Sequence, residues 1–426
     1  MTSGRAPAAQ PPLIVHVVHR LGVGGLESGL VNLINRLPAR QWRHAIVALT
    51  DVSPEFAGRI DRPDVRCFAL GKGPGHLVSQ YPQLFRLFRA LEPAVVHTRN
   101  VAALEAVVPA WAAQVRVRVH GEHGWTLQDP DGRRQRYRLV RRAYRPFVSH
   151  YVALSQQLED YLTCQVGVPS TRISKIFNGV DTERFRPSAN VSHATSVFPF
   201  RSEDAWIVGT IGRMETLKDP LSLVRAFIRA RELAPSLAGR MRLVMVGDGP
   251  LRQEIAAMLD RPALKESVWL AGERSGVEEV LGGLDCFVLP SRAEGSSNTI
   301  LEAMATGLPV VATRIGGNAD LIESGMTGTL VAPGDTEAMA RAILAYAIDR
   351  AGARRHAKAA RRVVESRFSV DRMVSDYASL YRRALIEAGV PVPIESAPRR
   401  SDDPVNHAAA AAANDTHPVS RSTVAR

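Results

Sequence analysis

The chain has 426 residues, enough for two domains of ordinary size, and its 45% hydrophobic and 23% charged residues are typical of a globular protein. Its net charge of +12 would suit nucleic acid, but no zinc finger, RNP-like motif or basic-region zipper accompanies that charge, so we expect no nucleic-acid partner. The three cysteines are far apart and match no metal or redox spacing, which predicts a reduced, cytoplasmic protein.

Two segments bear on membrane attachment. Residues 1–12 contain one arginine and no long apolar core, so we predict no signal peptide. Residues 101–115 are rich in alanine, but they include Glu105 and are too short to span a bilayer. We therefore expect any membrane contact to be peripheral, on the inner face of the plasma membrane.

The first half of the chain alternates between short apolar runs, typical of buried strands, and longer amphipathic runs, typical of helices. Such alternation predicts a parallel sheet covered by helices on both faces. The expected strands are 13–18, 44–49, 65–69, 94–97, 115–120, 151–154 and 173–176. The expected helices are 27–37, 77–91, 102–113 and 156–165.

The pattern breaks at residues 178–187, and a second α/β series follows. Its expected elements are 207–211, 221–233, 243–246, 251–259, 268–271, 277–281, 286–289, 299–306, 310–312, 319–322, 328–331 and 336–350, before a last helix at 370–387. In open α/β sheets ligands bind at the carboxyl ends of the strands, so a cleft between two such sheets is the expected site.

The predicted architecture is therefore α/β, with two doubly wound, Rossmann-like domains facing each other across a cleft. We expect an acceptor-side domain at residues 1–195 and a donor domain at 196–369. Residues 370–390 should form a helix that packs back on a domain surface. Residues 391–426 are rich in proline, alanine and serine and are expected to be a disordered tail.

A basic stretch lies between residues 133 and 145. It contains Arg133, Arg134, Arg136, Arg138, Arg141, Arg142 and Arg145, with Tyr137, Leu139, Val140 and Tyr144 among them at helix-like spacing. A basic amphipathic helix suits anionic lipid headgroups or a pyrophosphate-linked acceptor. The alternative is an arginine-rich face that is only solvated.

The most informative segment is E-G-S-S-N-T-I-L-E, which runs from Glu294 to Glu302 between an apolar strand and a predicted helix. Residues 297–299 would begin that helix, so their backbone N–H groups would be unpaired, and such a helix N-terminus readily binds phosphate. The two glutamates would bracket one ligand, and carboxylates accept hydrogen bonds from vicinal hydroxyls such as those of ribose and hexose. Two surface glutamates are the alternative interpretation.

Two further turns follow strands. Gly24 and Gly25 open the first helix, so the backbone there can approach a ligand closely, but Glu27 breaks the G-x-G-x-x-G pattern and argues against a nicotinamide cofactor. In the second half, Arg213 and Lys218 follow a strand and would neutralise the charge of a departing diphosphate. Surface cations in a loop are the alternative.

Histidines and possible nucleophiles are the remaining candidates for chemistry. His120 ends a predicted strand at the expected cleft, where it would make a polar contact with a reacting sugar; His120, Glu122 and His123 lie too close along one loop to have the usual zinc spacing. The sequence contains no Ser-His-Asp order, nucleophile elbow or Walker lysine. This pattern favours catalysis by positioning and electrostatics, without a covalent nucleophile.

In this order the motifs resemble those of family 4 glycosyltransferases, retaining enzymes of the two-domain GT-B fold. They are G-G near the start, H-G after the middle strands, N-G-V-D-x-x-x-F, G-R-x-x-x-x-K, G-x-G-P, and E-x7-E with L-E-A-M-A-x-G-x-P-V-V-A. The segment H-G-E-H-G-W is also similar to the sugar transferases that accompany bacterial exopolysaccharide and exosortase loci.

The resemblance implies a role for each site residue. Arg213 and Lys218 would grip the donor diphosphate, Glu294 the donor sugar and Glu302 the ribose. The segment of Ser296, Ser297, Asn298 and Thr299 would hold phosphate or sugar, and its two serines depart from the aromatic or proline and glycine of many members, which leaves the donor open. His120 would sit beside the reacting sugar, with His123 as its rival, while Gly24 and Gly25 would close over the diphosphate and acceptor.

The expected function is the transfer of a sugar from a UDP- or GDP-sugar to a glycan acceptor, either lipid-linked or an oligosaccharide. The transfer would need neither a metal ion nor a cofactor and would retain the anomeric configuration of the sugar. The alternatives are a GT-B epimerase or hydrolase of nucleotide sugars, and a basic membrane- or nucleic-acid-binding protein with a vestigial cleft.

Overall fold

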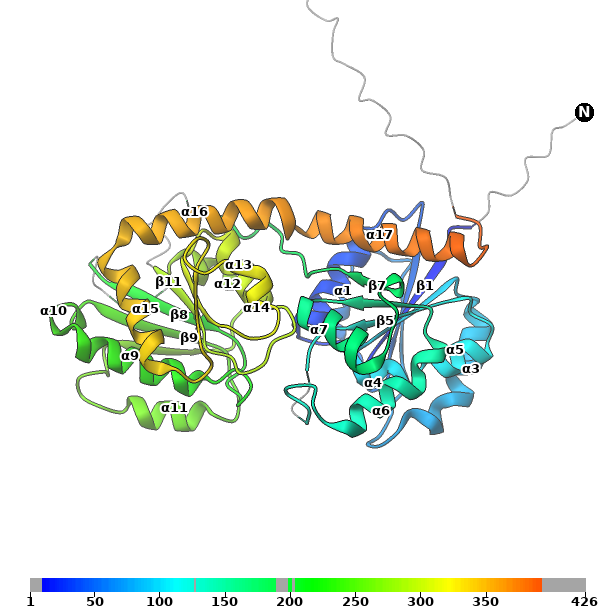
Figure 1. Ribbon diagram of the computed structural model, residues 1–426, viewed down its shortest axis with the longest axis horizontal. Helices are drawn as coiled ribbons and strands as arrows, with labels where there is room; N and C mark the ends of the chain where they lie inside the picture. The colour runs from blue at the N-terminus through cyan, green and yellow to red at the C-terminus, as the bar shows by residue number, and fades with distance from the viewer. Residues whose placement is uncertain (1–9, 126–127, 189–197, 201–203, 393–426) are drawn as a thin grey trace, which may run out of the picture. The chain divides into compact units, whose positions relative to one another are not determined.

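The computed structural model describes residues 10–125, 128–188, 198–200 and 204–392 (Figure 1). The tail expected at 391–426 lies outside these residues from position 393 onward.

Strands from the first half of the chain form one parallel sheet. Among the described residues it has seven strands in the order β3-β2-β1-β4-β5-β6-β7, and every paired neighbour is parallel. Its strands are β1 (Leu13–Val18), β2 (Arg43–Ala48), β3 (Arg66–Ala69), β4 (Val95–Arg99), β5 (Val117–Glu122), β6 (His150–Ala153) and β7 (Ile173–Lys175). The order reverses beside β1, as in doubly wound folds.

Helices connect these strands. They are α1 (Gly25–Arg36), α2 (Pro54–Ala57), α3 (Tyr81–Leu91), α4 (Asn100–Leu104), α5 (Val107–Ala112), α6 (Gln135–Tyr144) and α7 (Gln156–Asp160). Three 3₁₀ helices, η1 (Leu77–Gln80), η2 (Arg145–Phe147) and η4 (Ser170–Arg172), and a π-helix, η3 (Tyr161–Val166), accompany them.

A second parallel sheet forms from the later strands. In the part of the chain that the structure describes it has six strands in the order β10-β9-β8-β11-β12-β13. Its strands are β8 (Trp206–Ile211), β9 (Met241–Val246), β10 (Val268–Gly272), β11 (Cys286–Leu289), β12 (Val310–Thr313) and β13 (Thr329–Val331). Its helices are α9 (Pro220–Leu233), α10 (Pro235–Ala238), α11 (Arg252–Leu259), α12 (Val277–Gly282), α13 (Asn298–Ala305), α14 (Asn318–Leu321), α15 (Thr336–Ile348) and α16 (Arg350–Arg367).

Three local differences from the sequence prediction have physical causes. The helix expected at 102–113 is interrupted between α4 and α5, because Pro109 has no N–H to donate to the carbonyl of Glu105. Strand β5 continues to Glu122, two residues beyond the predicted end, and this places His120 inside the strand. Helix α16 was not predicted, because its buried stripe is mostly alanine and gives a weak hydrophobic signal.

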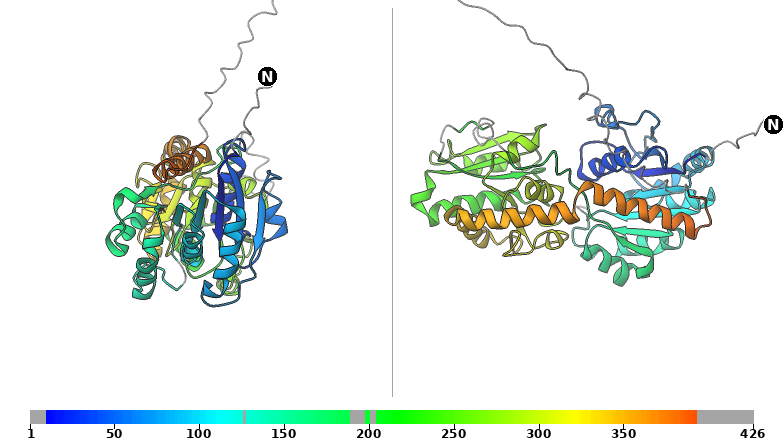
Figure 2. Two further views of the ribbon diagram at one scale, coloured as in Figure 1. Left: turned by 90° about the vertical axis from the view of Figure 1, so that its right-hand side faces the viewer. Right: turned by 90° about the horizontal axis from the view of Figure 1, so that it is seen from above.

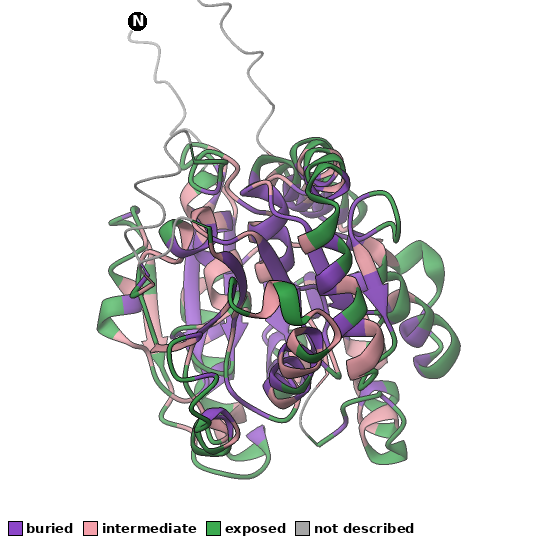
Figure 3. Cartoon of the chain, turned by 90° about the vertical axis from the view of Figure 1, so that its left-hand side faces the viewer, coloured by how far each residue is buried: buried purple, intermediate pink, exposed green. Residues whose placement is uncertain are grey.

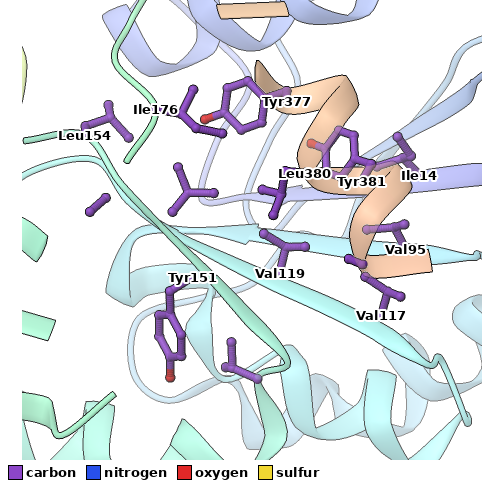
Figure 4. Close-up of a cluster of buried hydrophobic side chains, with 14 of the residues drawn as sticks. Ile14, Val95, Val117, Val119, Tyr151, Leu154, Ile176, Tyr377, Leu380 and Tyr381 are labelled. Atoms are coloured by element: carbon purple, nitrogen blue, oxygen red, sulfur yellow. The ribbon is translucent and has the colours of Figure 1, made fainter. Parts of the chain in front are cut away.

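The last helix, α17 (Val370–Glu387), packs back on the first sheet, as predicted. In Figure 2 it continues from α16, and the two helices follow one another along the molecule. Tyr377, Leu380 and Tyr381 enter the same core as Ile14, Val95 and Ile176 (Figure 4). The Tyr381 hydroxyl and His97 Nδ1 are 2.7 Å apart, so this contact also has a polar component.

The central strands are the most buried elements, whereas the edge strands β3, β7 and β10 are only partly buried, and the outer faces of the helices are exposed (Figure 3). All six residues of β1 and all four of β11 are buried. Such continuous apolar runs are expected where helices cover both faces of a parallel sheet. The carboxyl ends of the strands therefore carry polar turns on a rigid support.

Candidate active site

The turn between β11 and α13 brings two predicted site residues together. Lys218 Nζ lies 2.6 Å from Glu294 Oε1, and the Ser291 hydroxyl donates to the same oxygen over 2.7 Å. Glu294 is buried, whereas the Lys218 side chain is 27% exposed. A buried carboxylate held by an ammonium group and a hydroxyl has a fixed orientation, so this turn is preorganised.

Helix α13 begins directly after this turn. Ser297 is its N-cap, and the Ser297 hydroxyl accepts a hydrogen bond from the backbone N–H of Ile300. The hydroxyls of Ser297 and Thr299 are 3.1 Å apart. The first-turn N–H groups are thus grouped at one point, as the sequence predicted.

Two polar atoms at this turn are buried without a hydrogen-bond partner in the structure. They are the hydroxyl oxygen of Ser296 and Oδ1 of Asn298. The Asn298 amide nitrogen donates to the carbonyl of Gly25 over 3.1 Å, so it links the start of α13 to the Gly24–Gly25 turn. Buried polar atoms without partners are costly, and a bound ligand would satisfy them.

Glu302 lies one turn into α13 and is half-buried. It lines a cavity of about 510 Å³ together with Asn298, Arg184 and Arg274. Burial raises the pKa of Glu302 to about 7; the charge of Arg184 lowers it, and the carboxylate of Glu278 raises it. Arg184 forms an ion pair of 2.9 Å with Glu278.

A second glycine-rich loop supports this turn and was missed in the sequence. A Cβ on Gly316, whose φ is +45°, would overlap the carbonyl oxygen of Glu294. The Gly317 N–H donates to the carbonyl of Gly295 over 3.0 Å. The signal that could have revealed the loop is the G-G pair after strand β12, in the same strand–turn–helix setting as the other turns.

The predicted cations differ from one another. Lys218 touches Glu294, but Arg213 extends outward, with its side chain 75% exposed and paired with Glu215 at 3.0 Å. The structure therefore does not bring Arg213 and Lys218 onto a common partner. An exposed guanidinium with one neighbour keeps donors free for a ligand.

Glu27 is a second group missed in the sequence. A Cβ on Gly24 would overlap Glu27 Oε2, so this carboxylate folds back over the Gly24–Gly25 turn. Burial raises the pKa of Glu27, while its own backbone N–H and the charges of Arg99 and Arg213 lower it. Its place three residues after the N-cap Gly24 is the signal, since that position reaches back to a helix start.

The structure favours His123 over His120 for contact with a ligand. His120 is fully buried, with Nδ1 2.8 Å from the Thr98 hydroxyl and Nε2 3.3 Å from Glu122 Oε1, so both ring nitrogens are occupied. Both ring nitrogens of His123 are buried without partners. The expectation that His120 meets the sugar stays a prediction, but β5 runs two residues further than predicted, so the His120 ring lies within the strand and not at its end.

The basic stretch does form a helix, α6, but its arginines do not share one solvated face. Arg141 is buried and donates twice to Glu122, with Nε 2.5 Å from Oε1 and Nη2 3.0 Å from Oε2. Arg138 and Arg142 bond to Gln165, through its side-chain and backbone oxygens respectively. Burial alone would raise the pKa of Glu122, but the charge and hydrogen bonds of Arg141 and the contact with His120 bring it well below its usual range.

The exposed arginines of this region are Arg133, Arg134, Arg136 and Arg142. Arg141 is unavailable to any external partner. None of the helices that the structure describes combines the length and the apolar composition that a membrane span requires.

Family models match both halves of the chain. Residues 23–184 match the model of glycosyltransferase family 4, and residues 205–349 match that of glycosyl transferases group 1. The chain belongs to glycosyltransferase family 4. The two matches contain every predicted site residue from Gly24 to Glu302.

Curated relatives of this glycosyltransferase act on different substrates. The UDP-Gal:alpha-D-GlcNAc-diphosphoundecaprenol alpha-1,3-galactosyltransferase of Escherichia coli is 27% identical over 63% of this chain and 70% of its own length. The GDP-mannose-dependent alpha-mannosyltransferase of Mycobacterium tuberculosis is 27% identical over 86% of this chain and 96% of its own. The lipopolysaccharide core biosynthesis mannosyltransferase LpcC of Rhizobium leguminosarum is 34% identical over 51% of this chain and 61% of its own.

Solved structures share the fold. Anabaena Alr3699/HepE, in complex with UDP and glucose, aligns over 87% of this chain and all of its own, with a TM-score of 0.73 and 22% sequence identity. This family 4 glycosyltransferase therefore has the GT-B fold of two Rossmann-like domains, as predicted.

Proposed function

We propose that this protein is a retaining glycosyltransferase. It moves a sugar from a UDP- or GDP-sugar to a glycan acceptor, which is lipid-linked, in the synthesis of exopolysaccharide or another cell-surface glycan. The observation that carries the proposal is the preorganised turn of Glu294, held by Lys218 and Ser291, next to the unpartnered buried oxygens of Ser296 and Asn298.

Each part of this turn has a proposed task. The Glu294 carboxylate accepts hydrogen bonds from the donor sugar, and the N–H groups at the start of α13 hold phosphate. Glu302, in its cavity, binds the ribose hydroxyls. Lys218 and Arg213, instead of a metal ion, neutralise the negative charge that grows on the leaving diphosphate, so no cofactor is needed.

We propose that the reaction keeps the configuration of the sugar. The bond between the anomeric carbon and the diphosphate oxygen breaks, and the acceptor hydroxyl attacks from the same face. The departing diphosphate takes the hydroxyl proton as the new carbon–oxygen bond forms. His123 contacts the reacting sugar, since its ring nitrogens are without partners, and Gly24 and Gly25 approach the diphosphate and acceptor.

The lipid-linked acceptor is supported by the E. coli relative, whose name specifies a diphosphoundecaprenol acceptor. We propose that the exposed arginines of the α6 region bring the protein to an anionic membrane surface, on the cytoplasmic side.

Calorimetry tests the donor site. Purified protein is titrated with UDP, GDP, ADP and their sugars, with a chelator present and no added metal. Micromolar binding of one nucleotide that is lost in Glu302→Ala supports the proposal, and no binding to any of them contradicts it. Product analysis then separates a transferred glycoside from the free sugar of a hydrolase and the altered sugar of an epimerase.

A further inference from the structure

Three histidines and an arginine are buried inside the first sheet, where a strand covered on both faces usually carries apolar residues. His16 lies in β1, His44 in β2 and His97 in β4, and Arg99 is the last residue of β4. None of the described residues places a carboxylate within ion-pair distance of Arg99. A buried cation without a carboxylate partner is costly, which points to a task beyond packing.

The hydrogen bonds of Arg99 determine which nitrogen of each histidine carries the proton. A guanidinium can only donate, so His16 Nδ1, which is 3.0 Å from Arg99 Nη1, is an acceptor, and His16 carries its proton on Nε2. That nitrogen donates to His44 Nδ1 over 3.0 Å. Burial and the charge of Arg99 lower the pKa of His16, and burial with the charge of Arg62 lowers that of His44 to about 3, so both rings are neutral.

A second branch runs from Arg99 through helix α17 to His97. Burial raises the pKa of the Tyr381 hydroxyl, and the charge and hydrogen bond of Arg99 oppose this effect. Because the Tyr381 oxygen accepts from Arg99, its own proton is donated to His97 Nδ1 over 2.7 Å. His97 therefore carries its proton on Nε2. We call this chain of Arg99, Tyr381 and His97 the relay.

The second nitrogen of His97 faces His123. In the part of the chain that the structure describes, His97 Nε2 and both ring nitrogens of His123 are buried without a hydrogen-bond partner. A Cβ on Gly121 would lie 3.3 Å from His97 Nε2 and 2.7 Å from His123 Nε2, so both nitrogens border the space that the absent side chain leaves. The His97 proton reaches His123 Nε2 there, directly or through one water. His123 then carries its own proton on Nδ1.

Charged and titratable groups surround His123 on several elements. They are His97 and Arg99 of β4 and His120 and Glu122 of β5. The turn before α13 adds Glu294, since the adjacent Gly295 lies against the His123 carbonyl, but Lys218 already pairs with that carboxylate. Burial lowers the pKa of His123 well below its usual range, Arg99 and His120 lower it further, and Glu122 raises it. The ring is therefore neutral at physiological pH.

We propose that Arg99 is a positioning residue for glycosyl transfer. Through the relay it holds His123 as a neutral ring with its proton on Nδ1, and this N–H is a fixed donor to an oxygen of the reacting sugar. A neutral donor is required because breaking the bond to the diphosphate leaves positive charge on the sugar, which a nearby imidazolium would oppose. The inference rests on the proposed function, in which His123 contacts the sugar.

Histidine NMR tests the relay without any substrate. Long-range ¹H–¹⁵N spectra of the full chain, labelled with ¹⁵N-histidine, report the tautomer and the protonation of each ring, and His97→Gln and His123→Gln assign the signals. We expect His97 with its proton on Nε2 and His123 neutral with its proton on Nδ1 from pH 5 to pH 8. A wild-type His123 that is protonated at pH 7, or that carries its proton on Nε2, would overturn the proposal.

Tyr381→Phe breaks the relay and keeps the aromatic ring in the core. We expect mixed tautomers of His97 and His123, and a fall in turnover at saturating donor of about tenfold, with the KM for donor within about twofold of the wild type. Tyr377→Phe is the matched control, because Tyr377 is also buried on α17 and its hydroxyl makes no hydrogen bond to a histidine within the described residues. Unchanged tautomers in Tyr381→Phe, or an equal loss of turnover in Tyr377→Phe, would contradict the relay.

Arg99→Gln tests the charge. We expect the pKa of His123 to rise toward its ordinary value of about 6.5, so turnover at saturating donor should fall at acid pH in this variant and stay level in the wild type. Identical His123 titrations in the two proteins would overturn the role of Arg99. Melting curves show whether Arg99→Gln is folded, and Tyr381→Phe decides the matter if it is not. If the wild type transfers no sugar, the proposed function fails, while the NMR spectra still decide the relay.

Discussion

The donor affinity should depend on pH through Glu302. Burial raises the pKa of this carboxyl to about 7, with Arg184 lowering and Glu278 raising it. If ribose hydroxyls bind the ionised carboxylate, the binding-competent fraction of free protein is about one tenth at pH 6 and about nine tenths at pH 8. The affinity for donor should therefore rise about tenfold across this interval.

Calorimetry with UDP-glucose and GDP-mannose measures this change, because their phosphates are fully ionised throughout. Glu302→Gln should bind more weakly at pH 8 and show a flat profile. Glu278→Gln should move the rise to lower pH, since it removes a negative neighbour and releases Arg184 from its 2.9 Å ion pair. A flat profile in the wild type, or an equal slope in Glu302→Gln, would refute the reasoning.

The same raised pKa affects stability, and the sign can be worked out. Between the ordinary carboxyl pKa and about pH 7, the folded protein keeps a proton that the unfolded chain releases. The contribution of Glu302 to the free energy of unfolding is therefore greatest at low pH and is lost as the pH rises through 7. Denaturant unfolding measures the free energy of unfolding at pH 5 and pH 8, and its decrease between these pH values should be smaller in Glu302→Gln than in the wild type.

Four other variants address separate features. Lys218→Ala should slow turnover on the order of 100-fold or more because it removes a cation that neutralises the leaving diphosphate, with the exposed Lys265→Ala as control; near-normal turnover would contradict that role. His123→Ala should reduce turnover about tenfold or more at unchanged melting temperature, and a loss of turnover accompanied by a lower melting temperature would indicate a structural role. Arg141→Met should lower the free energy of unfolding by about 3–5 kcal/mol in chemical denaturation, since it leaves Glu122 buried without its partner. Adding Glu122→Gln to this variant should recover part of the lost stability, and a double variant as unstable as Arg141→Met alone would argue against the pair. Changing Arg133 and Arg134 to Gln should lower partitioning onto anionic vesicles on the order of 30-fold, at about 1 kcal/mol per arginine, whereas Arg354 and Lys358 changed likewise should not; unaltered partitioning would leave those arginines merely solvated.

Much of the fold could be predicted from the sequence, because its signals are local. Apolar runs such as 13–18 and 286–289 are buried strands, since only a sheet covered on both faces needs continuous apolar residues. The last helix was predicted at residues 370–387, the observed bounds of α17, because its apolar residues recur on one stripe formed by Met373, Tyr377, Leu380, Tyr381 and Leu385. The segment from Glu294 to Glu302 likewise contains its own strand end, turn and helix start.

The site depends on contacts between distant residues, and these were decided by the tertiary structure. Lys218 and Glu294 are far apart along the chain, yet their side chains meet because β8 and β11 are neighbours in one sheet. By its spacing from the other arginines of residues 133–145, Arg141 belongs to a solvated basic face. Instead α6 packs on the end of β5, and the Arg141 side chain is buried against Glu122. No local pattern carries that information.

Two histidines of the first half also differ in a way that the sequence did not reveal. His120 and His123 lie in one short motif, and their difference depends on where the β5 hydrogen-bonded ladder stops. The sequence determined the strand–turn–helix scaffold, the glutamate pair and the placement of the polar turns. Only the tertiary structure decided which side chains are buried or partnered, because burial is set by the elements that pack against each residue and not by the residue's own neighbours in sequence.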